Sequence, residues 1–132
     1  MRSIKFRAWN ETEKHMYSWG NLLNQNLKNI FTIPEQCGYN IMQYTGLKDE
    51  NGKEIYEGDI IEFSYDMFVG NFDTFVAKGK VVFEEGAFYV EVLENERTTE
   101  DEVYLLYSIN LDTIEVIGNI YENKELLDET NR

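Results

Sequence analysis

The chain holds one histidine and one cysteine, His15 and Cys37, the residue types most often used in nucleophilic catalysis. A thiol becomes an effective nucleophile when a neighbouring imidazole takes its proton and a third group orients the imidazole. A single histidine among aromatic residues is more often structural, however, and a single cysteine usually packs as a small apolar side chain. A small hydrolase is therefore one hypothesis, and it depends on where the fold places these two side chains.

Neighbouring carboxylates offer a second route to hydrolysis, because two acids with different pKa values can act as general acid and general base. Asp59 lies close in sequence to Glu57 and Glu62. A chain with 25 acidic residues contains such pairs without any function. For Asp59 we favour a structural role, in which the carboxylate accepts backbone N–H groups at a turn and fixes the start of the strand at Ile60.

Ligand sets for a metal ion or a phosphate group are missing from the sequence. One cysteine and one histidine cannot form a zinc site, and the acidic run 100–102 lacks the spacing of a calcium loop. We interpret that run as part of a solvated loop. The glycines at 52, 58 and 86 are isolated and do not form a phosphate-binding loop. We therefore expect no catalytic residue, no metal site and no cofactor.

The N-terminal segment combines cationic and aromatic side chains. Residues 3–9 alternate as in a half-buried strand, whose second face carries two cations and a tryptophan. The aromatic run 15–19 is expected to pair with it as a hairpin, so that the two tryptophans share one layer. Single-stranded nucleic acids stack on such a mixture of side chains. The candidate interaction surface consists of Lys5, Arg7, Trp9 and Trp19.

The net charge of −13 is distributed unevenly. Residues 1–40 carry five basic and three acidic residues, a net charge of +2, whereas the other 92 residues carry seven and twenty-two, a net charge of −15. An acidic excess of this size disfavours direct binding to nucleic acid or to an anionic membrane. It can simply keep the protein soluble. Alternatively, the basic N-terminal part docks on the acidic remainder, in its own chain or in a neighbouring subunit.

Length and composition suit one domain, 1–132, with possible subdomains at 1–40 and 41–132. Nine tyrosines and eight phenylalanines favour sheets over helical bundles. The single cysteine excludes an internal disulfide, and no apolar run is long enough to span a bilayer. The polar N-terminus lacks the apolar core of a signal peptide, so we expect a cytosolic protein with no membrane partner.

The segment 41–63 is the most informative part of the chain. The run Asp49-Glu50-Asn51-Gly52 places turn-forming residues between the apolar runs 44–47 and 54–56, which predicts a chain reversal. A second corner then leads into a short β-prone run at 60–63. The residues expected to set turns in the whole chain are Asn51, Gly52, Gly58, Asp59, Gly86 and Gly118.

Further strands follow the central segment. Alternation over 75–83 and 87–93, around Glu84-Glu85-Gly86, predicts a hairpin. Val103–Ile109 is expected to be extended, and 113–121 is expected to be a strand with a bulge or a close backbone approach at Gly118. Asn123 is expected to cap a helix over 124–129.

The segments 20–40 and 64–74 give weak signals. A short helix is compatible with the first, and Pro34 should end it and begin a loop over 33–38. Together the elements predict a mainly β protein, in which antiparallel hairpins form a small SH3-like barrel or sandwich body with an N-terminal β-hairpin subdomain and short helices.

Four stretches of the sequence resemble the YopX family of phage and prophage proteins. They are IKFRAWN at 4–10, MQYTGLKDENGKEIYEGDII at 42–61, VVFEEGAFYV at 81–90 and IEVIGNIYENKELL at 114–127. The chain departs from the family pattern at Lys124, where proline is common, and this affects only the start of a helix. The resemblance implies a mainly β protein with a small-barrel-like part, no established activity, a tendency to form homo-oligomers and no known site residues.

The leading hypothesis is a phage or prophage protein that acts as a non-enzymatic, self-associating protein-interaction module. Its N-terminal hairpin would dock on an acidic face of another copy. One alternative is an effector that mimics DNA and binds a host protein, with carboxylates in place of phosphates. Another is a nucleic-acid-binding accessory protein, which the acidic excess disfavours.

Overall fold

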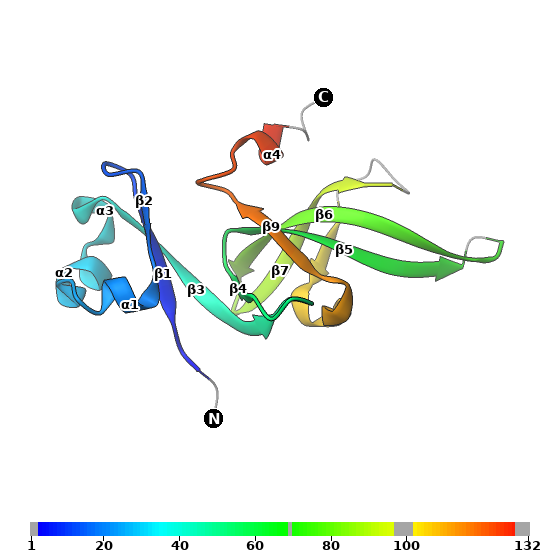
Figure 1. Cartoon of the computed structure of the whole chain (residues 1–132), viewed down its shortest axis with the longest axis horizontal. Coiled ribbons are helices and arrows are strands. Elements are labelled where there is room, and N and C mark those ends of the chain that lie inside the picture. Colours follow the sequence, from blue (N-terminus) through cyan, green and yellow to red (C-terminus); the bar gives the residue numbers. More distant parts are fainter. Residues whose placement is uncertain (1–2, 69, 97–101, 129–132) are drawn as a thin grey trace.

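The computed structural model describes residues 3–68, 70–96 and 102–128, and its strands form two antiparallel sheets (Figure 1). The first sheet has the order β2-β1-β3-β4, made of β1 (Phe6–Asn10), β2 (His15–Tyr17), β3 (Tyr39–Lys48) and β4 (Glu54–Tyr56). The second has the order β8-β7-β6-β5-β9, made of β5 (Asp59–Phe68), β6 (Phe72–Glu84), β7 (Ala87–Asn95), β8 (Val103–Leu105) and β9 (Glu115–Asn119). The chain is mainly β, with one half-barrel and few short helices, which confirms the predicted fold class.

The first sheet is covered on one face by three short helices, α1 (Trp19–Leu22), α2 (Leu27–Thr32) and α3 (Pro34–Cys37). Alternate side chains of β1 point toward the helices, and among them Ala8 packs with Leu22 and Ile30. The predicted N-terminal hairpin is confirmed by the pairing of β1 with β2. The predicted loop at 33–38 is wrong. Pro34 occupies the first turn of α3, where its missing N–H is not needed for the helix.

Strand β3 joins the two halves of the molecule. Its first half pairs with β1 and its second half pairs with β4 after the reversal at 49–52, as predicted. Ile55 of β4 is fully buried in the core of the second sheet. The first sheet is therefore attached to the second through one continuous strand and the short strand that follows it.

The second sheet curls around an apolar core to form the half-barrel. The predicted hairpin at Gly86 is confirmed, with Phe83 opposite Phe88 and their ring centroids 5.0 Å apart. The core residues are Ile55, Ile61, Phe63, Ala77, Val81, Val90, Leu106, Ile114 and Val116. Gly118 lies at a register shift between β5 and β9, which confirms the expected bulge.

Two details at the C-terminal end differ from the prediction. The segment Val103–Ile109 is only partly extended, since β8 is followed by the 3-10 helix η1 (Leu106–Ser108), which turns Leu106 into the core. A helix, α4 (Glu125–Asp128), is present where one was expected. Its expected cap is wrong, because the Asn123 side chain accepts the N–H of Asn119 at 3.1 Å and holds the preceding turn instead.

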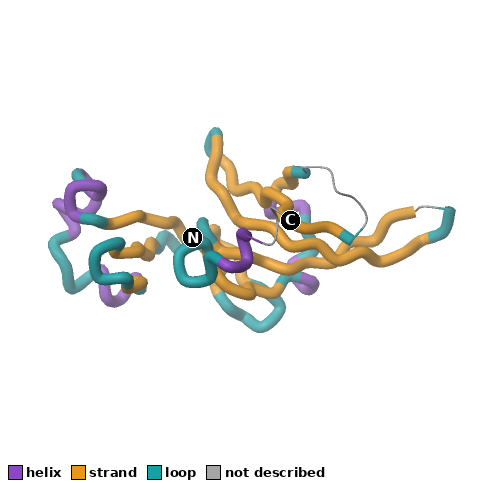
Figure 2. The backbone as a smooth tube through the Cα atoms, turned by 90° about the horizontal axis from the view of Figure 1, so that it is seen from above, coloured by secondary structure: helices purple, strands orange, loops and turns teal. Residues whose placement is uncertain are grey.

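The segment 64–74, which the sequence left open, forms a projecting ribbon. β9 pairs with β5 only as far as Glu62, whereas β5 and β6 remain paired out to Phe68 opposite Phe72. Figures 1 and 2 show this ribbon extending away from the rest of the molecule in both views. We call the paired segments 64–68 and 72–76 the arm.

Candidate interaction site

Arg7 of β1 connects the two sheets at their junction. The Arg7 Nη2 group donates to Asp59 Oδ1 at 2.8 Å and to the carbonyl of Glu57 at 3.3 Å. The guanidinium carbon also lies 4.8 Å from the centre of the Tyr56 ring. Lys5 forms an ion pair with Glu54 at 2.6 Å. The basic N-terminal strand thus docks on acidic residues of its own chain, one of the two arrangements that the charge distribution suggested.

Asp59 is the centre of this junction and is only 1% exposed. Its second oxygen, Oδ2, accepts the backbone N–H of Tyr56 at 2.7 Å, which confirms the structural role inferred from the sequence. Burial raises the pKa of Asp59 above its ordinary value, although the Arg7 cation and the Tyr56 N–H act in the opposite direction. A buried carboxylate of this kind requires its cation, because removing one partner leaves an uncompensated charge.

Gly58 shapes the corner between β4 and β5, which consists of Glu57, Gly58 and Asp59. Its φ of +88° is a conformation that residues with a Cβ rarely adopt, and an added Cβ would lie 2.9 Å from the sulfur of Met42. Its N–H donates to the carbonyl of Val81 at 2.8 Å, and its carbonyl accepts the N–H of Ile120 at 2.9 Å. The corner therefore connects β4 to both β6 and the segment that follows β9.

Asp49 attaches the β3–β4 turn to the second sheet. Its Oδ1 accepts the N–H groups of Asn51 and Lys53, both at 2.9 Å, while Oδ2 accepts the N–H of Val116 at 3.0 Å. Burial acts to raise the pKa of Asp49, but the three backbone donors together hold it below its ordinary value. Sequence reasoning identified the turn but not this contact across 67 positions.

The two tryptophans of the predicted surface lie on opposite faces of the first sheet. Trp9 is only 6% exposed and stacks on Tyr121, with ring centroids 5.7 Å apart. Trp19 packs against Phe6 on the helical face, at 5.9 Å. The prediction that the tryptophans share a layer, with Trp9 exposed, is wrong, because both faces of β1 are covered by other parts of the chain.

The arm presents the opposite arrangement. Phe68 and Phe72 face each other at its tip, with ring centroids 5.2 Å apart in an edge-to-face geometry. They are 63% and 76% exposed, and neither belongs to the core of either sheet. Large apolar side chains gathered at one exposed point are typical of a contact surface.

Comparison with known proteins places the chain in a family. The family model described as YopX protein matches residues 5–128. The chain belongs to the YopX family. None of the curated proteins matches it. Among solved structures, the crystal structure of protein EF1440 from Enterococcus faecalis is similar, with 27% identity, 96% of this chain and 99% of that chain covered, and a TM-score of 0.58.

The residues considered for catalysis in this YopX-family chain have structural contacts. The His15 ring packs edge-to-face on Tyr17 at 4.8 Å, and Cys37 ends α3 with a free thiol. The carboxylate of Glu57 accepts the N–H of Gln43 at 3.2 Å. Residues 100 and 101 lie outside the described part of the chain. In that part, no group of three His, Cys, Asp or Glu side chains is arranged to hold a metal ion, and no helix is long and apolar enough to cross a membrane.

Sequence reasoning missed the arm of the YopX chain. A signal was present, because Gly70-Asn71 is a turn dipeptide flanked by Phe68 and Phe72 at matching positions. The alternation on either side is broken by consecutive apolar residues, Met67-Phe68 among them, so the sequence pattern does not distinguish a buried face of the ribbon from an exposed one.

Proposed function

We propose that this protein is a phage- or prophage-encoded, cytoplasmic, non-enzymatic interaction module, and that it self-associates through the tip of its arm. The observation that carries the proposal is the exposed pair Phe68 and Phe72 at the end of a ribbon that leaves the body. A folded chain gains nothing from ordering two large aromatic side chains in water, whereas a partner that covers them would remove their apolar surface from solvent.

A second copy supplies a partner of the same chemistry. Two tips related by a two-fold axis would place the same aromatic pair on both sides of the contact, which is the self-complementary arrangement of a cyclic dimer. Edge-to-face contacts between the four rings would add to the burial of apolar area.

The charges support the tip over the N-terminal hairpin as the contact. Lys5 and Arg7, which were expected to attract an acidic face of another copy, form ion pairs within the chain. Two chains of net charge −13 repel each other. Association through the aromatic tip should therefore strengthen as salt screens that repulsion, whereas docking of opposite charges would weaken.

Light scattering coupled to size exclusion tests the proposal over a range of protein concentrations at low and high salt. We expect the average mass to rise with concentration, and more steeply at high salt. The double variant Phe68→Ser/Phe72→Ser should remain monomeric. The matched control is Tyr107→Ser, since Tyr107 is 74% exposed but lies in η1, outside the arm. A wild-type monomer under all conditions, or a double variant that associates like wild type, would contradict the proposal.

The proposal does not extend to DNA mimicry or to direct nucleic-acid binding. On the outer face of the second sheet, Lys78 pairs across the strands with Glu62 and Glu94, and Lys80 with Glu91, so cations interrupt the row of carboxylates. The cations and the tryptophan of β1 that could face a single strand are engaged inside the chain.

A further inference from the structure

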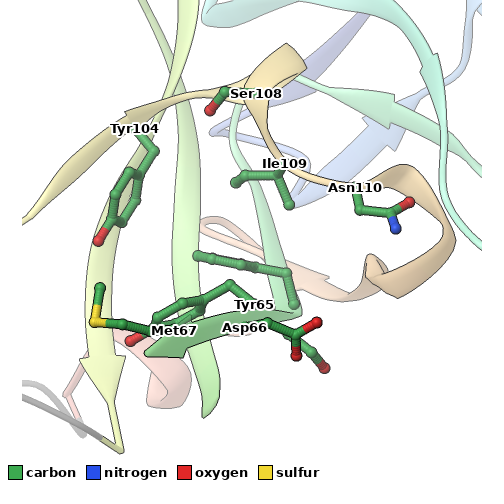
Figure 3. A pocket seen from close by; sticks show the side chains of 9 residues that line it. Tyr65, Asp66, Met67, Tyr104, Ser108, Ile109 and Asn110 are labelled. Atoms are coloured by element: carbon green, nitrogen blue, oxygen red, sulfur yellow. The ribbon is translucent and has the colours of Figure 1, made fainter. Parts of the chain in front are cut away.

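A groove runs along the outer edge of β5 where β9 leaves it. Beyond Glu62 the chain of β9 turns away, and Ser64–Met67 form one side of the groove while Ser108–Asn110 form the other. The volume of the groove is about 320 Å³. Figure 3 shows the Tyr65, Met67, Tyr104 and Ile109 side chains around this space, with Asp66 and Asn110 at its rim.

The backbone of β5 has hydrogen-bonding groups that point into this groove. The N–H and C=O of Val76 both bond to Glu96, so they point away from β5. Ser64, which lies opposite Val76, therefore belongs to a pair that exchanges no ladder bonds, and its own N–H and C=O point to the outer edge. The Ser64 carbonyl accepts the hydroxyl of Thr113 there, at 3.1 Å.

The period of a strand extends this orientation to Asp66, whose N–H and C=O must also point to the outer edge. Over the ranges that the structure describes, no strand pairs with β5 along this stretch. An unpaired edge of this kind is a template for one more strand. The position that such a strand would take is the continuation of the path of β9.

The floor of the groove selects the side chains that an added strand would carry. Its apolar members are Phe63, Tyr65, Met67, Tyr104 and Ile109. Because successive side chains of a strand point to opposite faces, every second residue of the incoming segment would lie on this floor and should be apolar. The intervening residues would face solvent.

The charges around the groove indicate which charged residues the incoming segment should carry. Among the lining residues that the structure describes, none is basic, and Asp66 lies on the edge itself. Glu115 lies just beyond its inner end, beside Glu62, which Lys78 faces on the other side, and Asp112 follows Asn110. The arm of a second copy carries Asp66 and Asp73, which disfavours it here. Lysine or arginine residues beside the apolar positions would match the carboxylates.

We propose that this groove binds an extended segment of another protein, which has apolar residues at alternate positions and basic residues at its ends and which adds to β5 as an extra strand. Backbone bonds to the N–H of Ser64 and to the N–H and C=O of Asp66 would give the segment its register, and the floor would select its side chains. This site is separate from the aromatic tip and involves a different partner, so it does not depend on self-association.

A synthetic peptide with alternating valine and threonine at its centre and lysines at both ends serves as the probe. Fluorescence anisotropy measures its affinity, and amide NMR spectra of the protein show which residues respond. We expect saturable binding, with the largest shifts at Ser64, Asp66 and Ser108–Asn110. Two control peptides have glutamates in place of the lysines, or N-methyl groups on alternate amides that remove the backbone donors.

Two protein variants separate backbone pairing from charge. Asp66→Pro removes the carboxylate and the outward N–H, and proline is tolerated on a strand edge whose N–H faces solvent. Asp66→Ala removes the same carboxylate but keeps the N–H. We expect Asp66→Pro to bind the lysine-flanked peptide at least about tenfold more weakly than Asp66→Ala, the loss that corresponds to about 1.4 kcal/mol.

Each outcome decides for or against the groove. Binding by the lysine-flanked peptide that falls with N-methylation, with glutamate flanks and in Asp66→Pro supports it. No saturable binding, equal binding by either control peptide, or equal binding by the two Asp66 variants overturns it. If Asp66→Pro does not fold, the N-methylated peptide with the wild-type protein still tests the backbone bonds. The Phe68→Ser/Phe72→Ser variant should bind the peptide as wild type does, even if wild type proves monomeric.

Discussion

The junction of the two sheets and the arm use similar residue types in opposite ways. At the junction, the half-buried Arg7 forms an ion pair with Asp59, and the buried Trp9 stacks on Tyr121, so both side chains are engaged within the chain. At the tip of the arm, Phe68 and Phe72 pack edge to face on each other and remain exposed. The junction therefore contributes to the stability of the fold, whereas the arm offers surface to a partner.

The comparison shows why residue type alone does not identify an interaction surface. A strand that carries cations and a tryptophan on one face has the composition of a binding site. It becomes part of the interior when carboxylates and aromatic rings elsewhere in the chain are brought against it. Mutations should consequently change folding stability at the junction and association at the arm.

The largest expected effect is at Arg7. In Arg7→Met, Asp59 keeps its buried carboxylate without a cation, and the free energy of unfolding should fall by about 3–5 kcal/mol. Urea denaturation followed by circular dichroism measures this change. The matched control is Lys14→Met, since Lys14 pairs with Glu11 at an exposed site, where an ion pair contributes about 0–1 kcal/mol at most. Equal effects of the two substitutions would remove the distinction between a buried junction and an ordinary surface pair.

A smaller effect is expected at Asp49. In Asp49→Asn one amide hydrogen would face the N–H of Val116 or of the turn, so a buried donor loses its acceptor and the unfolding free energy should fall by about 1–3 kcal/mol. Asp112→Asn is the control, since Asp112 is not among the buried polar residues.

The same variant tests the pH dependence. Because the pKa of Asp49 is lower in the folded than in the unfolded chain, its stabilisation is present above the ordinary value near 4 and is lost as the pH falls through the folded-state pKa. The difference in unfolding free energy between wild type and Asp49→Asn should therefore become smaller in acid. At Asp59 the sign is opposite: its raised pKa means that protonation of the folded chain begins first and relieves part of the cost of burial. If the unfolding free energies of wild type and Asp49→Asn differ by the same amount at neutral and acidic pH, the three backbone N–H groups do not hold the pKa of Asp49 down.

Gly58 gives a third test of the junction. Alanine at this position must adopt a positive φ, which costs about 1–2 kcal/mol, and must also displace the Met42 side chain. Gly86→Ala is matched, since Gly86 has a φ of +84° but no atom within 4 Å of an added Cβ. Thermal unfolding should show a larger loss of stability for Gly58→Ala, and the difference between the two variants measures the packing of the corner. Equal losses would mean that Met42 moves aside without cost.

Local chemistry explains what the sequence predicted correctly. The turn at Asn51-Gly52, the hairpin at Gly86 and the backbone role of Asp59 each follow from residues within a few positions of one another. These features depend on φ preferences and alternation, which a single sequence displays.

The features that the sequence did not predict depend on contacts between segments that are distant along the chain. Nothing near Trp9 in sequence indicates that Tyr121 covers it, and nothing near Asp49 indicates Val116 as its donor. Lys5 and Arg7 were assigned to a surface because their partners, Glu54 and Asp59, lie about 50 positions away. The arm was missed for a related reason: its length depends on where β9 stops pairing with β5, which is a property of the sheet and not of residues 64–74.

The smallest change in stability is expected at the arm. Phe68→Ser/Phe72→Ser removes two exposed rings that belong to neither core, so the unfolding free energy of the monomer should stay within about 0.5 kcal/mol of wild type. Amides of the arm beyond Asp66 should exchange with solvent faster than those of β6 next to β7, since they lie in the outer part of a two-stranded ribbon, past Tyr65, which still packs against the core. Urea denaturation at low protein concentration and hydrogen exchange measure the two quantities. A loss of about 2 kcal/mol or more would mean that the tip packs on the body in solution, and the contrast between a buried junction and an available arm would then fail, because the same rings would be serving the fold.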